Sequence, residues 1–214
     1  LKRNELYRLN PGLSAQERLY PGPVLVTALE DMPVFETTLL GYAYPWANEG
    51  VLKNILSYAG TLVPFTYGFT ERGTLVVPDD AALLALGKAF GVKTLLHLST
   101  LTEQGNFSAS LARTVLNNQE ARTALVQNTV RMMLESGFSG VDVDFEFLGR
   151  ELATPYAAFL AELSQAVHAA GGCFMAAVAP KTSDDQPGVL YEGHDYAAIG
   201  AVCDQVLIMT YEWG

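Results

Sequence analysis

The stretch FSGVDVDFEF, residues 138–147, decides the fold of this chain and most of its chemistry. Side chains alternate between the two faces of a strand, so Asp142, Asp144 and Glu146 project together, about 6.5 Å apart at each step. Carboxylates inside a hydrophobic strand are costly unless they share protons or bind a ligand. The apolar residues that project the other way, towards covering helices, are Val141, Val143, Phe145 and Phe147.

Similar apolar runs recur along the chain and alternate with helical patterns. The strand-like runs cover 37–44, 61–70, 93–100, 140–147, 173–180 and 205–212, and the helical stretches between them include 79–90, 118–136 and 155–170. Runs of this length that are apolar on both faces are typical of parallel strands. Strand–helix–strand repetition therefore predicts an α/β fold, with a parallel sheet and right-handed crossovers.

The residues at the end of the first strand-like run distinguish between two candidate folds that have parallel strands. A doubly wound nucleotide-binding sheet carries a glycine-rich phosphate loop there, whereas this chain has LGYAYPW at residues 40–46. Aromatic and polar residues follow several strands, where barrel enzymes build their sites. The sequence thus favours a (β/α)8 TIM-type barrel. Six strands can be counted where a closed barrel needs about eight, so we expect it to be truncated after the sixth strand.

Composition narrows the class of partner. The 214 residues carry 13 basic and 23 acidic side chains, a net charge of −10 that argues against nucleic acid and fits an uncharged polysaccharide. No run of about 18 apolar residues is present, so we expect no membrane span. No signal peptide is visible, and a targeting segment would have to lie outside this chain. We expect Cys173 and Cys203 to be buried free thiols, with a disulfide as the open alternative.

Three acids on one strand fit two kinds of chemistry. They could hold a divalent metal ion, although carboxylates on one straight strand converge poorly on an ion. Alternatively, like charges raise one another's pKa, so that the outermost group stays protonated near neutral pH and acts as a general acid. Glu146 is longest in reach and nearest the carboxyl end of the strand, so it is the predicted proton donor. Asp144 would exchange a proton with Asp142 while facing the substrate.

Two motifs on successive strands resemble one enzyme family. The run SGVDVDFE at 139–146 resembles the fourth-strand signature D-G-x-D-x-D-x-E of glycoside hydrolase family 18, the chitinase-like enzymes, with Ser139 in place of the leading Asp. LIMTYEWG at 207–214 resembles the sixth-strand M-x-Y motif of that family. APKT at 179–182 and LYEGHDY at 190–196 are similar to its branch of bacterial spore-cortex-lytic N-acetylglucosaminidases. The resemblance covers about residues 35–214.

The resemblance implies a retaining mechanism without an enzymic nucleophile or a cofactor. The acetamido oxygen of the substrate would attack the anomeric carbon while Glu146 protonates the leaving oxygen. Asp144 would orient the acetamido N–H, Asp142 would support Asp144, and Tyr211 would donate a hydrogen bond to the acetamido oxygen. The implied substrates are β-1,4-linked N-acetylglucosamine polymers, with peptidoglycan (spore cortex in particular) preferred over chitin. The implied location is the cell wall, the spore or the extracellular space.

Other readings of the same residues remain open. A carbohydrate-binding, lectin-like protein on this scaffold would have lost catalysis, and the presence of Glu146 favours the enzyme over it. A metal-dependent hydrolase is a third hypothesis, although His97, His168 and His194 are too scattered to indicate a metal site. Sugar rings present apolar faces, so strand-end aromatic residues are candidates for stacking. The predicted substrate-binding residues are Tyr42, Phe65, Tyr67, Met209, Glu212 and Trp213.

The first thirty residues differ in pattern from the rest. Residues 5–27 resemble the second half of a LysM module, whose pattern runs L-x-x-L-N-P-x-L and then L-x-P-G-x-x-L, with Pro23 as a departure. Such modules bind N-acetylglucosamine polymers. We therefore predict a partial LysM-like glycan-binding module at 1–30 and a family 18 catalytic domain at 31–214. The matching residues are Leu6, Leu9, Asn10, Pro11, Leu13, Leu19, Pro21, Gly22 and Leu25.

Overall fold

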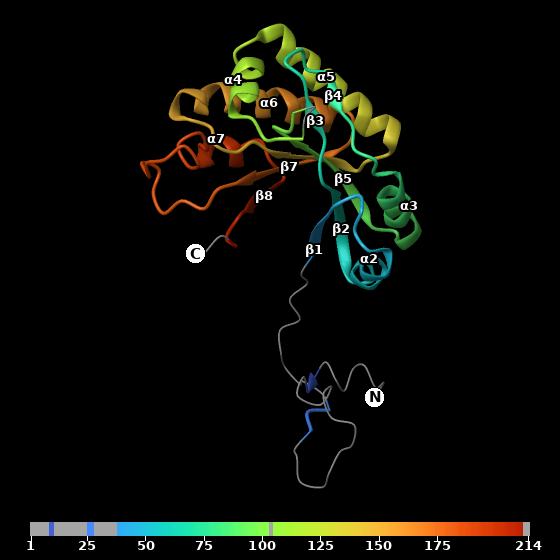
Figure 1. The fold of residues 1–214 in the computed structure, drawn as a ribbon. Coiled ribbons are helices and arrows are strands. Elements are labelled where there is room, and N and C mark those ends of the chain that lie inside the picture. The colour runs from blue at the N-terminus through green and yellow to red at the C-terminus, as the bar shows by residue number, and fades with distance from the viewer. Residues whose placement is uncertain (1–8, 11–24, 28–37, 103–104, 212–214) are drawn as a thin grey trace. The chain divides into compact units, whose positions relative to one another are not determined.

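The computed structural model describes residues 9–10, 25–27, 38–102 and 105–211 (Figure 1). The chain divides into two compact units, Leu1–Thr37 and Thr38–Gly214. In the first unit, the side-chain amide of Asn10 donates to the backbone oxygen of Val26 and accepts from its N–H, both at 2.8 Å. Most residues of the LysM-like pattern lie outside the described ones, so that module stays a prediction.

A curved sheet of six parallel strands forms the second unit, as the sequence predicts. Its order is β1–β2–β5–β6–β7–β8, so each strand lies beside the next one along the chain that belongs to the sheet. The strands are β1 (Leu39–Ala43), β2 (Ala59–Pro64), β5 (Lys93–Ser99), β6 (Gly140–Asp144), β7 (Cys173–Val178) and β8 (Gln205–Ile208). A two-stranded antiparallel sheet, β3 (Gly68–Phe69) and β4 (Leu75–Val76), accompanies it.

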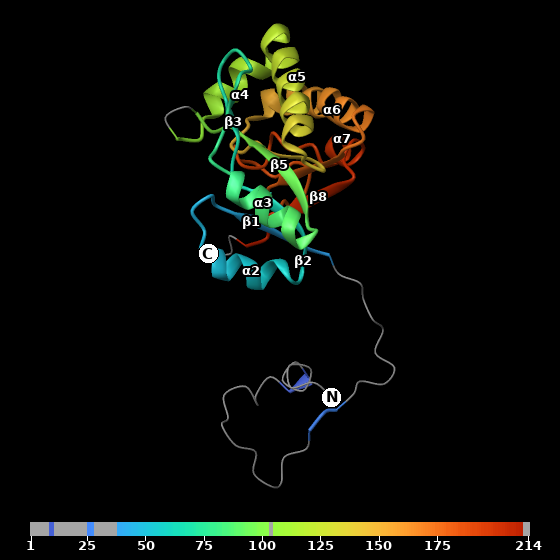
Figure 2. The ribbon, with the colours of Figure 1, turned by 90° about the vertical axis from the view of Figure 1, so that its right-hand side faces the viewer.

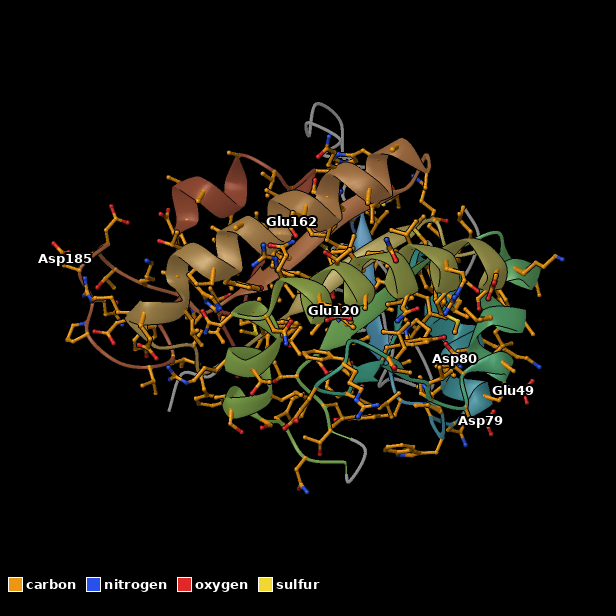
Figure 3. The ribbon with its side chains drawn as sticks, turned by 90° about the horizontal axis from the view of Figure 1, so that it is seen from above. Glu49, Asp79, Asp80, Glu120, Glu162 and Asp185 are labelled. Atoms are coloured by element: carbon orange, nitrogen blue, oxygen red, sulfur yellow. The ribbon has the colours of Figure 1, made fainter. Side chains whose placement is uncertain are left out.

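Helices lie around the outside of the curved sheet (Figures 1 and 2). They are α2 (Glu49–Leu56), α3 (Ala81–Phe90), α4 (Ala109–Leu116), α5 (Gln119–Ser136), η2 (Arg150–Leu152), α6 (Ala153–Ala169) and α7 (Tyr196–Gly200). The view from above shows Glu120 on α5 and Glu162 on α6 in this outer layer (Figure 3). No helix among the described residues is both long and apolar enough for a membrane span.

Strand β6 is the centre of the core, between β5 and β7. Val141, Val143 and Phe145 are fully buried under the helices, as predicted. Phe147 departs from the prediction: it is 52% exposed with a φ of 56°, because the strand ends at Asp144 and the chain turns. Gly140 allows β7 to approach closely, since a Cβ there would meet the backbone oxygen of Cys173 at 2.1 Å.

The structure also decides two expectations from the sequence, one about the cysteines and one about an apolar run. Cys173 and Cys203 are free and partly buried, as expected. The apolar run 61–70 is not one strand, because β2 ends at Pro64 and the next strand, β3, begins at Gly68.

Candidate active site

The acidic residues lie at the carboxyl end of β6. Asp142 and Asp144 belong to the strand and are 0% and 8% exposed, whereas Glu146 follows its end and is partly buried. The parallel register places His97 of β5 beside Asp142. The site is therefore built where the parallel strands end, at the edge where barrel folds carry their catalytic residues.

Asp142 has two hydrogen-bond partners, one from the adjacent strand β5 and one from β1. The Tyr42 hydroxyl of β1 donates to Asp142 Oδ2 at 2.9 Å, and His97 Nδ1 lies 2.6 Å from the same oxygen. These donors stabilise a carboxylate that burial alone would strongly disfavour. Tyr42 is predicted from the sequence as a sugar contact, whereas His97 has no predicted role. Both belong to the hydrogen-bond network of Asp142.

Asp144 is the acid whose protonation is most affected by its surroundings. Burial raises the pKa of Asp144 to about 7 from its ordinary 3.8. The charge of His97 opposes that rise, while the charges of Glu146 and Asp142 add to it. Asp144 therefore changes its charge close to neutral pH, where acid–base chemistry on a glycan would operate. The retained proton expected on Glu146 stays a prediction.

A cavity of about 300 Å³ opens in front of Asp144. Its size is at the lower end of the range of ligand pockets, and its walls are mainly aromatic and aliphatic with few polar groups, as in many small-molecule sites. The lining residues come from the ends of all six strands of the large sheet or the segments after them: Tyr42, Ala43, Tyr44, Phe65, His97, Asp144, Ala177, Leu207, Met209 and Tyr211. The structure thus brings together Asp144, Tyr42, Phe65, Met209 and Tyr211 of the predicted site.

Tyr67 lies elsewhere, which corrects its prediction as a sugar contact. It is 1% exposed, and its hydroxyl donates to Asp80 Oδ2 at 2.9 Å. Its ring packs edge-on against Phe138 in the main core. The chain leaves β2 before this residue, so Tyr67 pairs with Leu98 of β5 instead of pointing into the cavity. Glu212 and Trp213 lie outside the described residues.

Tyr44 extends the aromatic wall of the cavity to the surface. Its ring stacks on Trp46 at 4.7 Å between centroids and contacts Phe65 edge-on at 5.2 Å. Phe65 in turn contacts Phe107 at 6.1 Å. Trp46 is 78% exposed, so a continuous row of rings leads from solvent to the acids.

His194, from the LYEGHDY motif, ties the segments after β6 and β7 together. Its Nδ1 accepts the N–H of Ala179 at 3.1 Å, so Nε2 carries the hydrogen and donates to the backbone oxygen of Phe145 at 2.9 Å. Burial lowers the pKa of His194, which favours this neutral form. The side chain is 1% exposed and holds the backbone next to Glu146 in place.

The described residues contain no group of three or more His, Cys, Asp or Glu side chains arranged to hold a metal ion. Asp142 is partnered by a tyrosine and a histidine. Their arrangement suits proton transfer and hydrogen bonding to a bound sugar.

Comparisons with known proteins by sequence and by structure agree with one another. The profile described as "Glycosyl hydrolases family 18" matches residues 38–214. A cortical fragment-lytic enzyme of Bacillus subtilis (strain 168) is 36% identical over 159 residues, which are 74% of this chain and 36% of that protein. The crystal structure of the spore cortex-lytic enzyme SleL of Bacillus megaterium QM B1551 superimposes with a TM-score of 0.82 at 29% identity, over 100% of this chain and 51% of that one.

A more distant structure shows the fold alone. The chitinase of Chromobacterium violaceum ATCC 12472 superimposes with a TM-score of 0.75 at 23% identity, over 83% of this chain and 57% of that one. The chain thus spans between a third and three-fifths of the length of these relatives. The six parallel strands correspond to part of a TIM-type barrel, as the sequence predicts.

Proposed function

Because the chain belongs to the glycosyl hydrolases of family 18, we propose that it cleaves β-1,4-linked polymers containing N-acetylglucosamine. Peptidoglycan, and spore cortex in particular, is the preferred substrate over chitin. The names of the cortex-lytic relatives support this preference. The corresponding site of action is the spore or the cell wall.

The single observation that carries the proposal is the position of Asp144. This carboxyl group has a pKa raised by burial to about 7 and lines a cavity with aromatic walls. Sugar rings present apolar C–H faces to such walls, while their amide and hydroxyl groups need hydrogen-bond partners. A buried carboxylate beside aromatic rings meets both needs.

The roles proposed for the residues are those that membership of family 18 implies for the matching positions of this chain. Glu146 protonates the oxygen of the leaving sugar while the acetamido oxygen of the substrate attacks the anomeric carbon and forms a cyclic intermediate. Water, which gives a proton back to Glu146, then opens this intermediate from the opposite face, so that the configuration is retained overall. Asp144 in its ionised form accepts the acetamido N–H and stabilises the positive charge of the cyclic intermediate. Tyr211, which lines the cavity, donates to the acetamido oxygen. Asp142 supports Asp144 from within the strand.

Hydrolysis of cortex fragments and of a chromogenic chitobioside by the wild type and by Glu146→Gln tests the proposal. Glutamine keeps the shape of the side chain but cannot donate the proton, so kcat should fall by at least ~10²–10⁴-fold. Glu120→Gln is the matched control, because Glu120 is exposed in the first turn of α5. Equal rates for wild type and Glu146→Gln would refute the assignment of the acid. Binding without cleavage by the wild type would favour the lectin-like alternative.

A further inference from the structure

His97 is a buried ionisable side chain to which the roles proposed above assign nothing. It is 1% exposed and lies near the end of β5, opposite Asp142. Its Nδ1 lies 2.6 Å from Asp142 Oδ2. The ring is fixed between Phe65, stacked at 5.0 Å, and Tyr42, edge-on at 5.2 Å. The imidazole is therefore held in one orientation.

The second ring nitrogen lies near Asp144. Nε2 of His97 is buried, has no hydrogen-bond partner among the described residues, and lies 3.9 Å from Asp144 Oδ2. A buried polar nitrogen without a hydrogen-bond partner lowers stability, and proteins often tolerate this cost where the group has a functional role. Because Nδ1 is engaged with Asp142, Nε2 is the atom directed at Asp144.

His97 differs in its possible charge from the other titratable groups around Asp144. They come from β1, β5, β6, α6 and the segments that follow β6 and β8, and are Tyr42, His97, Asp142, Glu146, Tyr156 and Tyr211. Within this set His97 alone can carry a positive charge. A cation next to a buried carboxyl group favours its ionised form.

We propose that His97 is a positioning residue of this site, which anchors Asp142 through Nδ1 and holds Asp144 in its ionised form through Nε2. Ionised Asp144 is the form that accepts the acetamido N–H, so the inference rests on the proposed function. The same imidazole fixes one carboxylate and adjusts the charge of the next. Its effect on the reaction is transmitted through the two acids.

Two substitutions separate these contacts. Asparagine at this position keeps an N–H near the place of Nδ1 but removes Nε2 and the charge. Glutamine reaches towards the place of Nε2 and loses the Nδ1 contact. His168→Asn is the matched control, because His168 is 44% exposed on α6 and its Nε2 lies 2.9 Å from Asp204 Oδ2.

The kinetic test is the pH profile of kcat/KM with a chromogenic chitobioside for wild type and the three variants. In His97→Asn we expect the acidic limb to move to higher pH by about one unit or more, because Asp144 loses its cationic neighbour. His97→Gln should lower kcat/KM at every pH, since Asp142 is released, and His168→Asn should leave the profile in place. An unmoved acidic limb in His97→Asn, with or without a uniform loss of rate, would overturn the proposal.

A second measurement works without substrate and separates this inference from the proposed function. The carboxyl carbon of Asp144 is titrated by NMR in the wild type and in His97→Asn, after circular dichroism shows that both are folded. We expect Asp144 to titrate at higher pH in the variant. If the wild type cleaves no glycan but this shift occurs, the proposed function fails and the role of His97 stands. If the titration is the same in both proteins, the role of His97 is refuted.

Discussion

Replacing Asp144 by asparagine should stabilise the fold at alkaline pH while it abolishes the function proposed for this residue. Asp144 is 8% exposed, and burial raises its pKa to about 7 from 3.8. The folded chain therefore binds the proton more tightly than the unfolded chain does. Stability from this group is complete below the unfolded pKa of 3.8, decreases as the pH rises towards 7, and is constant above that.

The magnitude follows from the size of the shift. One pKa unit corresponds to about 1.4 kcal/mol, so a shift of about three units costs the folded wild type about 4 kcal/mol at pH 8. About 1.7 kcal/mol of this cost is already present at pH 5, so about 2.5 kcal/mol develops between pH 5 and pH 8. Asparagine cannot ionise and is free of this pH-dependent cost.

Urea unfolding of wild type and Asp144→Asn at pH 5 and pH 8 measures the difference. We expect the free energy of unfolding of the variant, relative to wild type, to increase by about 2.5 kcal/mol between the two pH values. Other titrating groups largely cancel in this comparison. Asp184→Asn, at an exposed loop position, is the control and should show no such change. A stability difference that is the same at both pH values would refute the assigned environment of Asp144.

Three further predictions concern the surroundings of the acids. His194→Ala should lower the free energy of unfolding by about 2–5 kcal/mol, because it leaves the buried Ala179 N–H and Phe145 C=O unpaired. A change below about 0.5 kcal/mol in urea unfolding, which is the size of an ordinary surface effect, would contradict this prediction. Trp46→Ala should raise KM for a long glycan about fivefold without changing stability, since the ring stacks on Tyr44 and is otherwise exposed. Tyr58→Ala is its control, an equally exposed ring just before β2, and an equal effect of both substitutions would exclude a sugar-binding role for Trp46. Activity should persist after dialysis against a chelator, whereas its loss, restored by a divalent cation, would favour the metal-dependent alternative.

The sequence predicts the parallel strands well because burial on both faces leaves a continuous apolar run, which is readable without knowledge of neighbours. It does not reveal the short helices α2 and α4, each eight residues long. Their signals are local: the side chain of Asn48 caps α2 by accepting from Val51 N–H, and Ser108 caps α4 in the same way through Leu111. A polar cap before eight residues is a weaker pattern than a long amphipathic stripe.

The site is predictable as far as it lies on one strand. Asp142 and Asp144 follow from their alternation, but the partners of Asp142 depend on the register with β5 and on the approach of Tyr42 from β1. A histidine inside the apolar run of β5 was the available signal for His97, since a buried imidazole needs a polar partner. Of the strand-end aromatic residues, Phe65 lines the cavity and Tyr67 is buried in the core, because the chain turns between them.

Asp144 and Glu146 are held in place by different parts of the structure, Asp144 by strand β6 and Glu146 by the core. Asp144 closes β6, so the sheet fixes its backbone, and the cavity and His97 determine its charge. Glu146 lies beyond the last paired residue, so hydrogen bonds of the sheet do not fix its backbone. Its neighbour Phe145 is fully buried, stacks on Tyr156 and Phe159 at 5.5 Å, and accepts a hydrogen bond from His194 at its backbone oxygen. Substitutions in this aromatic cluster should therefore displace Glu146 and reduce kcat, and they should also lower the pKa of Asp144 slightly, because the charge of Glu146 contributes to its rise.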